Sequence, residues 1–209
     1  MSTEEKATPF WEKSYRRPGR LDTFGGGKPS PDVVAIASRL TPPAKILDLG
    51  CGEGRNALYL ANLGHQIRAA DISGAGIEKL NLTAQATNVE VHTVVCDMRD
   101  YDFSEQLDLI VCQGCLHLIE RSEWQLVLQR MMDCTAPGGY HVVGVFTDTV
   151  PEPEDQAGLM VGLFQEGELF ELYRGWEILE QQARIFEHEH PDGPRHAHAA
   201  NSLTAIKPI

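Results

Sequence analysis

The residues best suited to binding chemistry lie in one short string, ILDLGCGEGRN (Ile46–Asn56). In it, an apolar stretch typical of a buried strand runs directly into Gly50, Gly52 and Gly54, and a helical pattern follows. Glycines allow a sharp turn and a close approach by a ligand, and the first amides of a helix point toward polar ligand groups. The GxGxG spacing differs from the GxGxxG fingerprint of dinucleotide sites.

Three acidic residues lie at the ends of three predicted strands. Asp48 stands two positions before Gly50, where its carboxylate can accept a hydrogen bond from an α-amino group and would repel a diphosphate. Asp71 is suited to holding both ribose hydroxyls. Asp97, with Met98 beside it, is suited to an adenine amino group and ring. The set predicts a site for a nucleoside that carries an amino acid, at the carboxyl ends of the strands.

The elements that must position these residues follow from hydrophobic periodicity. Apolar runs of strand length alternate with amphipathic stretches, which indicates βαβ units and a parallel sheet. The strands are expected at residues 45–49, 66–70, 91–95, 108–112, 140–146, 176–190 and 196–206. The pattern predicts an α/β fold, a Rossmann-like mixed sheet of seven strands with helices on both faces and the last strand pair antiparallel.

The helices are expected between these strands. Their ranges are 53–63, ended by Gly64; from a Ser73 cap to about residue 86; from a Ser122 cap to residue 134; and 166–174. Turns are expected at residues 137–139 and 191–194, and a loop at residues 148–156. Arg55 and Asn56 are interpreted as the start of the first of these helices.

The glycine string, Asp71 and VVCDMRDYDF (Val94–Phe103) together resemble class I S-adenosylmethionine-dependent methyltransferases. The resemblance implies S-adenosylmethionine as cofactor and S-adenosylhomocysteine as product. The cofactor-binding residues that it implies are Asp48, Gly50, Gly52, Asp71, Ile72, Asp97, Met98 and Gln113.

A more specific resemblance covers most of the chain. The strings GEGRNALYLANLGH, APGGYHVVGVFTDT, FQEGELFELYRGWEI and DGPRHAHAANSLTAIKP are similar to the tellurite-resistance (TehB-like) methyltransferase family. Membership implies methyl transfer to oxidised tellurium or selenium, or to other soft nucleophiles.

The same resemblance implies two catalytic residues near the chain end. Arg195 lies in a position that matches a family arginine, and His188 is the nearest matching histidine once a one-residue gap is allowed. Arg195 would hold an oxyanion oxygen, and His188 would orient the acceptor or act as a base. Glu189 stands where the family has an arginine, and residues 150–156 form an acidic insertion, so the chain departs from the family pattern at both places.

Other functions are weighed beside this one. A thiol or another small metabolite could be the acceptor. The histidines at 188, 190, 196 and 198 could instead serve a cofactor- or metal-sensing protein without turnover, although a solvated hairpin end without metal is the preferred interpretation. Cys112 and Cys115 are interpreted as structural thiols. His117 could face either the acceptor or the core.

Length and charge bound the class of protein. The 209 residues predict a single methyltransferase domain over 1–209, with an N-terminal lid at 1–30 and a core at 31–209. In the lid, Trp11 and Tyr15 could close over a sulfonium or pack against the edge of the domain. The net charge of −12 disfavours nucleic acid as a partner. Without a secretory signal or a long apolar run, the chain is expected to be cytoplasmic, to have no membrane partner and to act on a small molecule. A homodimer is one option for the oligomeric state, which the sequence leaves open.

Overall fold

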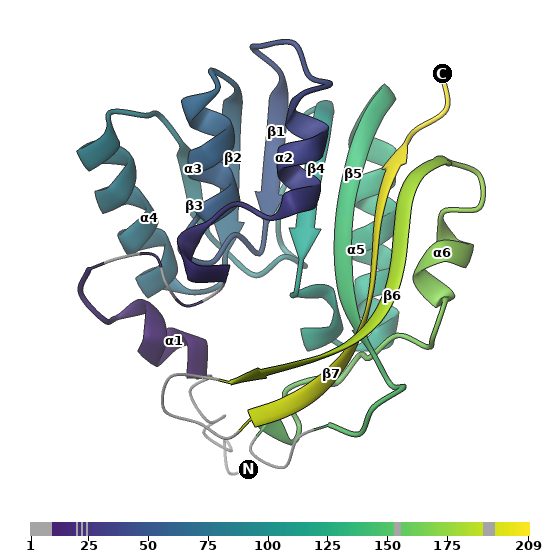
Figure 1. Ribbon diagram of the computed structural model, residues 1–209. Helices are drawn as coiled ribbons and strands as arrows, with labels where there is room; N and C mark the ends of the chain where they lie inside the picture. Colours follow the sequence, from purple (N-terminus) through teal and green to yellow (C-terminus); the bar gives the residue numbers. More distant parts are fainter. Residues whose placement is uncertain (1–9, 20, 22, 24, 153–155, 190–194) are drawn as a thin grey trace.

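The computed structural model describes residues 10–19, 21, 23, 25–152, 156–189 and 195–209. Its strands form one sheet in the order β3-β2-β1-β4-β5-β7-β6 (Figure 1). The strand bounds are β1 Lys45–Leu49, β2 Gln66–Asp71, β3 His92–Val95, β4 Leu107–Gln113, β5 Thr135–Thr147, β6 Glu177–Glu189 and β7 Arg195–Ile206. The first five strands run parallel, and β7 pairs antiparallel with both β5 and β6. The predicted Rossmann-like mixed sheet with an antiparallel last pair is confirmed.

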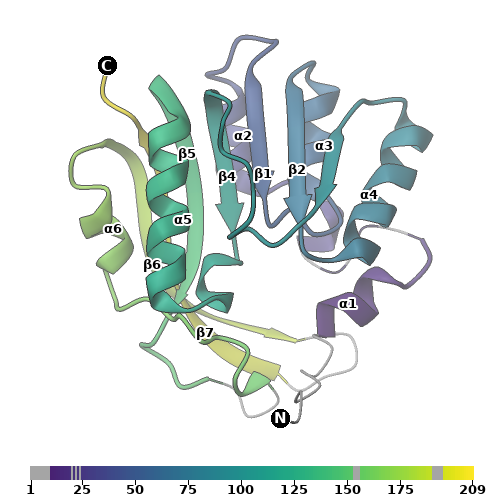
Figure 2. The same ribbon diagram turned by 180° about the vertical axis from the view of Figure 1, so that it is seen from behind.

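Helices cover both faces of the sheet, as expected (Figures 1 and 2). One face carries α2 Pro31–Ala37, α3 Arg55–Asn62 and α4 Gly74–Thr87, and the other carries α5 Arg121–Cys134 and α6 Glu168–Leu172. Three short elements, α1 Phe10–Tyr15, η1 Gly25–Gly27 and η2 Leu116–Leu118, complete the described helical segments. Among the described residues, no helix has the length and apolar character needed to cross a membrane.

Alternating strand residues build a core on each side of the sheet. Ile46, Leu109 and Val111 pack in the cluster that includes α2, α3 and α4. Leu47 and Ile110, their neighbours along the same strands, pack in the cluster that includes α5. Both faces of a parallel sheet are thereby buried, and the polar residues at the carboxyl ends of the strands stand out as candidates for function.

Helix starts show where local sequence signals decided the structure. The Ser73 hydroxyl accepts from the Gly76 amide at 3.0 Å, so the predicted cap of α4 is confirmed. The predicted Ser122 cap of α5 is wrong. Glu120 caps that helix in a reciprocal capping box with Glu123, which satisfies two backbone donors at once.

The turn predicted at residues 137–139 is wrong, because these residues lie inside β5. The register with β4 shifts between Leu107 and Leu109, which marks an irregularity at this point. Backbone hydrogen bonds link Gly138 and Gly139 to Lys207 just beyond β7. Gly138 has φ 76°, so its glycine is used for a kink within a strand rather than for a connection between elements.

Smaller boundary differences matter for the site. Asp71 and Gln113 are the last residues of β2 and β4, one residue beyond the predicted ends. The helix expected from residue 53 begins instead at Arg55, after Gly54 at φ 83°. Glu53 is therefore part of the glycine loop. The turn predicted at 191–194 lies outside the described residues.

Candidate cofactor and acceptor site

The glycine loop between β1 and α3 requires glycine at three positions. Gly50, Gly52 and Gly54 have φ values of 73°, 56° and 83°, in the region that side chains disfavour. Added Cβ atoms would also lie 2.4 Å from the Cys115 sulfur, 2.5 Å from the Tyr15 hydroxyl and 2.3 Å from a Leu80 methyl, respectively. The space that the glycines leave is therefore taken partly by the protein's own side chains.

Asp71 ties the second strand to this loop. One of its carboxylate oxygens accepts from the Gly52 amide at 2.7 Å, and the other accepts from the Ser73 amide at 2.8 Å. Burial raises the pKa of Asp71, while these two amides act in the opposite direction. The carboxylate is thus held at the mouth of the glycine loop, where the ribose role was predicted.

Asp48 is the most enclosed of the predicted acids. Its side chain is buried beneath the loop and accepts from the Ala57 amide of α3 at 3.1 Å. Burial raises the pKa of Asp48 to about 7, against the opposing effect of Arg55 nearby. A buried carboxyl of this kind gains most from a cationic partner such as an ammonium group.

The residues predicted for the adenine end lie beyond β2 and β3. Ile72 leaves 64% of its surface exposed, which is high for a large apolar side chain next to a binding loop. Met98 packs against the α5-side core. The Asp97 carboxylate accepts from the Arg99 side chain at 2.9 Å, and this partner lowers its pKa. The pairing with Arg99 was not foreseen from the sequence.

Gln113 ends β4 within a polar network. Its side chain accepts from Asn56 at 3.3 Å and donates to Asp32 at 3.4 Å. Asn56 in turn accepts from the Ser30 amide at 2.9 Å. The network connects the end of β4 with the first turns of α2 and α3, so Asn56 does more than begin a helix.

The described part of the N-terminal segment lies over this loop. The residues FWEKSY form α1, which packs against α4. Ser73 donates a short hydrogen bond to Glu12. Tyr15 is buried against Gly52, and burial raises the pKa of its hydroxyl, helped by the nearby acids Asp71 and Glu53.

Glu53 was missed as a candidate because it was read as a helical residue. It accepts from the Thr23 amide at 2.8 Å and pairs with Lys79 of α4 at 2.7 Å. Both charged side chains are almost fully buried. Its position between two glycines was the available signal, but the partners, 30 residues before it and 26 residues after it, could not be identified from the sequence.

An aromatic and imidazole stack lies where β5 meets the β6–β7 hairpin. The Phe146 ring lies between two imidazoles, with centroid distances of 4.4 Å to His117 and 4.7 Å to His198. The ring centroids of His196 and His198 lie 5.7 Å apart, and Nε2 of His196 lies 3.2 Å from Nε2 of Gln156. Both of these β7 histidines are buried, so the expectation of a solvated hairpin end is wrong for them.

His117 faces the core rather than open solvent. It is buried, and its Nδ1 accepts from the Phe146 amide at 3.2 Å. Burial lowers its pKa to about 3, with a smaller contribution from His198. A neutral imidazole whose Nδ1 accepts carries its proton on Nε2, so His117 is a hydrogen-bond donor at that atom.

The predicted catalytic residues lie on the two strands of the hairpin. His188 of β6 pairs with His196 of β7, and Arg195 pairs with Glu189. Neighbouring strand residues point to opposite faces, so Arg195 lies on the face opposite the buried His196. Its guanidinium is exposed and pairs with Glu187 at 2.6 Å. His190 lies outside the described residues.

The thiols of Cys112 and Cys115 are buried and lie 3.4 Å apart, sulfur to sulfur. The hydrogen bond with the Cys112 thiol and, after it, burial raise the pKa of Cys115, as expected for structural thiols. Within the described part of the chain, no group of three or more metal-binding side chains is present.

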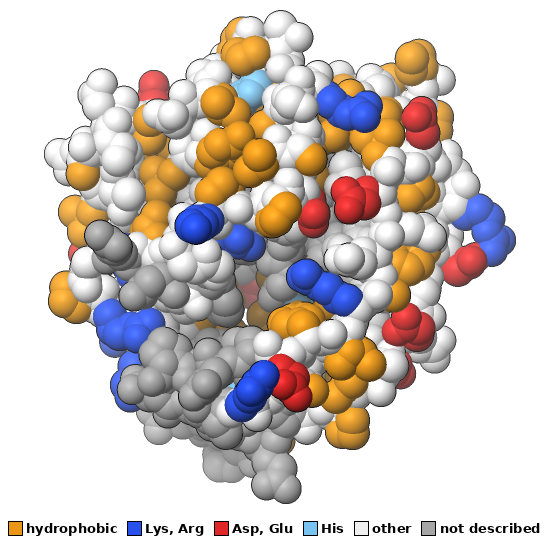
Figure 3. Space-filling model, viewed as in Figure 1, with side chains coloured by type: hydrophobic (Ala, Val, Ile, Leu, Met, Phe, Trp, Pro, Cys, Tyr) orange, Lys and Arg blue, Asp and Glu red, His pale blue; other side chains and the backbone are white. Residues whose placement is uncertain are grey.

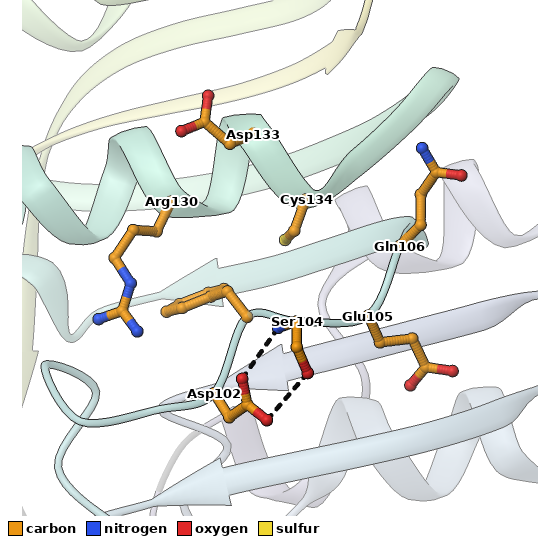
Figure 4. Close-up of a pocket in the computed structure, with 8 residues that line it drawn as sticks. Asp102, Ser104, Glu105, Gln106, Arg130, Asp133 and Cys134 are labelled. Atoms are coloured by element: carbon orange, nitrogen blue, oxygen red, sulfur yellow. Dashed lines mark hydrogen bonds between the residues drawn. The ribbon is translucent and has the colours of Figure 1, made fainter.

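Two concave regions differ in position. Figure 3 shows a hollow near the centre of one face, below the carboxyl ends of the central strands, with charged and apolar side chains around it. Another depression, of about 500 Å³, lies between α5 and the loop leading into β4, and Asp102, Ser104 and Arg130 are among its lining residues (Figure 4). This depression lies toward the amino end of β4, whereas the predicted cofactor residues lie at the carboxyl ends of the strands. None of the predicted site residues lines it.

The residues at the carboxyl ends fit the predicted cofactor. A buried carboxyl suits an ammonium group, a second carboxylate lies at the loop mouth, and an exposed isoleucine follows it. The strand order and the GxGxG loop are those of the class I S-adenosylmethionine-dependent methyltransferases.

Comparisons with known proteins agree. A family model described as tellurite resistance protein TehB matches residues 28–195. A probable S-adenosyl-L-methionine-dependent methyltransferase TehB of Haemophilus influenzae is 33% identical over 156 residues, which cover 74% of this chain and 53% of the relative. The chain thus spans about half the length of this curated relative. The chain belongs to the TehB tellurite-resistance family.

Solved structures support the same assignment. The crystal structure of TehB from Haemophilus influenzae superposes with a TM-score of 0.76 at 31% identity, covering 85% of this chain and 62% of that one. A Burkholderia thailandensis 1,6-didemethyltoxoflavin-N1-methyltransferase, solved with 1,6-didemethyltoxoflavin and S-adenosylhomocysteine, superposes with a TM-score of 0.63 at 25% identity, covering 86% and 77%.

Proposed function

We propose that this chain transfers a methyl group from S-adenosylmethionine to a small acceptor, with a tellurite- or selenite-type oxyanion as the first candidate. The role would be resistance or detoxification. The family match supports this most directly, because it extends from residue 28 through β6 to Arg195, the first residue of β7. The net charge of −12 favours a small acceptor over nucleic acid.

The cofactor contacts follow from the positions of the polar groups. Asp48 would accept from the ammonium group and Asp71 from the ribose hydroxyls, while Asp97 and Met98 would face the adenine. The remaining proposed contacts are Gly50, Gly52, Ile72 and Gln113. Support comes from the shared location of these residues at the carboxyl ends of β1 to β4.

When bound, S-adenosylmethionine supplies a methyl group that its sulfonium has already activated for displacement. The chain therefore needs only to hold and align the acceptor, which can account for about 7–11 kcal/mol of the barrier. Arg195 would exchange its pairing with Glu187 for an oxyanion oxygen. His188 would orient the acceptor, or remove a proton from an acceptor that carries one.

We also propose that residues 1–30 act as a lid within a single domain. Glu12, Tyr15 and Thr23 of this segment contact Ser73, Gly52 and Glu53 around the cofactor loop. A segment held by a few polar contacts can release and close again around a ligand.

A second candidate function is methyl transfer to a thiol or another small metabolite, including a heteroaromatic one. The low pKa of the buried His117 favours it, because a neutral imidazole beside the hairpin adds no positive charge for holding a small dianion. The Burkholderia thailandensis relative, at 25% identity, was solved with a heteroaromatic compound.

One experiment separates these functions. The chain is incubated with methyl-labelled S-adenosylmethionine and tellurite, selenite, a simple thiol, a hydroxylated heteroaromatic compound or no acceptor, and volatile and soluble products are trapped. Label transfer to tellurite or selenite, lost in Arg195→Ala with cofactor affinity unchanged, supports the oxyanion function. Transfer to the thiol or the heteroaromatic compound alone supports the second function. Cofactor binding without any transfer contradicts both.

A further inference from the structure

Arg55 occupies an unusual position for the first residue of a helix. It directly follows the glycine loop, and one of its guanidinium nitrogens donates to the Lys28 carbonyl at 3.0 Å. A Cβ on Gly25 would lie 2.9 Å from the same nitrogen, so the guanidinium packs against the backbone of Gly25. Arg55 therefore lies partly buried between the glycine loop and the N-terminal segment.

Among the residues that the structure describes, none provides a counter-ion in direct contact with Arg55. A guanidinium offers five N–H donors, and to the residues that the structure describes it makes the one hydrogen bond to Lys28 and no salt bridge. Arg99 and Arg121, in contrast, each pair with carboxylates. Burial lowers the pKa of Arg55, while Asp48, Tyr15 and Asp32 nearby raise it.

Asp48 and Arg55 influence each other without touching. Each appears in the electrostatic environment of the other, yet they form no ion pair in the described structure. A buried carboxyl and a partly buried guanidinium that lie near each other without pairing suit a ligand that carries both charges. The amino-acid end of S-adenosylmethionine is such a group, because its ammonium and carboxylate share one carbon atom.

We propose that Arg55 binds the α-carboxylate of the cofactor, opposite Asp48, which binds the α-ammonium. A guanidinium matches a carboxylate with two parallel hydrogen bonds. Arg55 and Asp48 then form one recognition unit for a zwitterionic amino acid, and the chain distinguishes cofactors by whether they carry the carboxylate. The inference rests on the assigned cofactor and on the proposed role of Asp48, and it is independent of the acceptor.

The wild-type chain provides the first test. Calorimetric titration compares S-adenosylhomocysteine with its decarboxylated analogue, 5′-deoxy-5′-(3-aminopropylthio)adenosine, which keeps the ammonium and lacks the carboxylate. Loss of a charge-assisted pair predicts that the analogue binds about 10- to 100-fold more weakly. Equal affinities for the two ligands would overturn the proposal without the need for any variant.

Arg55 variants then locate the interaction. Arg55→Gln should lose about 10- to 100-fold in affinity for S-adenosylhomocysteine and change little toward the analogue. Arg55→Lys keeps the charge but not the paired geometry, so its affinity for S-adenosylhomocysteine should lie between those of the wild type and Arg55→Gln. If Arg55 has only a structural role, Arg55→Gln should weaken the binding of both ligands equally, and that result refutes the assignment. Arg39→Gln, at an exposed position after α2, is the matched control and should bind both ligands as the wild type does.

The outcomes separate this inference from the proposed function. If no acceptor is ever methylated but the two ligands differ as predicted, the carboxylate role of Arg55 stands alone. If Arg55→Gln does not fold, as judged by circular dichroism, the comparison uses Arg55→Lys and the wild type. No difference between the ligands in either protein then contradicts the proposal.

Discussion

The carboxylate of Asp71 accepts from the Gly52 amide at 2.7 Å, which joins the end of β2 to the glycine loop after β1. The acid proposed to hold a ribose therefore also holds the glycine loop. If the proposed role is correct, ligand binding and loop geometry depend on the same side chain, and its substitution should affect both.

Replacing Asp71 tests this double role. Asp71→Asn keeps one acceptor oxygen but loses the charge, so affinity for S-adenosylmethionine should fall by about 10-fold or more. Calorimetric titration measures the change. Asp133→Asn, on the exposed side of α5, is the control. Unchanged affinity in Asp71→Asn would remove Asp71 from the cofactor site.

The pKa of Asp48 predicts a pH dependence of cofactor binding. Burial raises this pKa to about 7 in the ligand-free chain. An ammonium group binds the ionised form, so below pH 7 the carboxyl must first release a proton. Affinity should therefore fall as pH decreases from 7, by up to about tenfold per pH unit.

Two observations check the Asp48 prediction. Titrations in buffers of different ionisation enthalpy should reveal proton release on binding near pH 6. Asp48→Asn should bind weakly at every pH and lose this release. Proton release that persists in the variant would assign the effect to another group.

A buried hydrogen-bond chain predicts a loss of stability. The Tyr173 hydroxyl lies 2.6 Å from His141 Nδ1, and His141 Nε2 lies 2.7 Å from the Thr135 hydroxyl, which donates to the Met131 carbonyl. Because Thr135 donates to that carbonyl, His141 Nε2 donates to Thr135, and Tyr173 donates to Nδ1. Tyr173→Phe leaves Nδ1 without its donor and should cost about 1–3 kcal/mol in the free energy of unfolding by urea. Tyr140→Phe, outside this chain of contacts, should cost less, and equal losses would contradict the prediction.

The same histidine predicts an acid-sensitive stability. Burial lowers the pKa of His141 to about 3, below its ordinary value of 6.5. The neutral, folded form is fully favoured above pH 6.5, and as pH falls toward 3 the unfolded chain binds a proton that the folded chain does not. The stability from this group is thus lost on acidification, at up to about 1.4 kcal/mol per pH unit. Urea unfolding at several pH values between 6.5 and 5 gives the unfolding free energy as a function of pH. This free energy should decrease less steeply with falling pH in His141→Gln than in the wild type, and an equal decrease counts against the prediction.

The buried pair of Glu53 and Lys79, 2.7 Å apart, predicts non-additive substitutions. Glu53→Gln leaves the Lys79 ammonium without its buried counter-ion and should cost about 3–5 kcal/mol in unfolding free energy. Adding Lys79→Met should restore much of this loss, because the uncompensated charge is gone. Thermal and urea unfolding of the single and double variants measure the coupling, and additive losses would show that the pair does not act as a unit.

Most of the fold could be predicted because it depends on local patterns. Strand-length apolar runs and the Ser73 cap specify their elements through periodicity and side-chain chemistry over a few residues. One failure was local, since Glu120 rather than Ser122 caps α5. The other was long-range: residues 137–139 resemble a turn in sequence, but backbone hydrogen bonds to Lys207 and the pairing of the flanking Thr135 and Tyr140 with β4 keep them in β5.

The candidate site also combines residues that could be placed from the sequence with contacts that could not. Asp48 and Asp71 could be placed at the loop because each lies at the carboxyl end of its own strand. The partners of Glu53 and Arg55 come from positions that only the folded chain brings near, whereas Arg99, the partner of Asp97, is only two residues away and was missed as a local contact. The burial of His196 and His198 was also hidden, because strand register, not the spacing of histidines, decides which face they occupy.

The packing around the glycine loop limits what a GxGxG motif shows about the function of a distantly related sequence. Each of its three glycines makes room for a side chain of the protein itself, contributed by Cys115, Tyr15 and Leu80 from three separate segments. A lineage that abandoned the cofactor would still be under selection to keep these glycines, since a larger residue would collide with the interior. Retention of the glycine motif alone therefore reports inherited architecture and does not show that a chain still binds the cofactor.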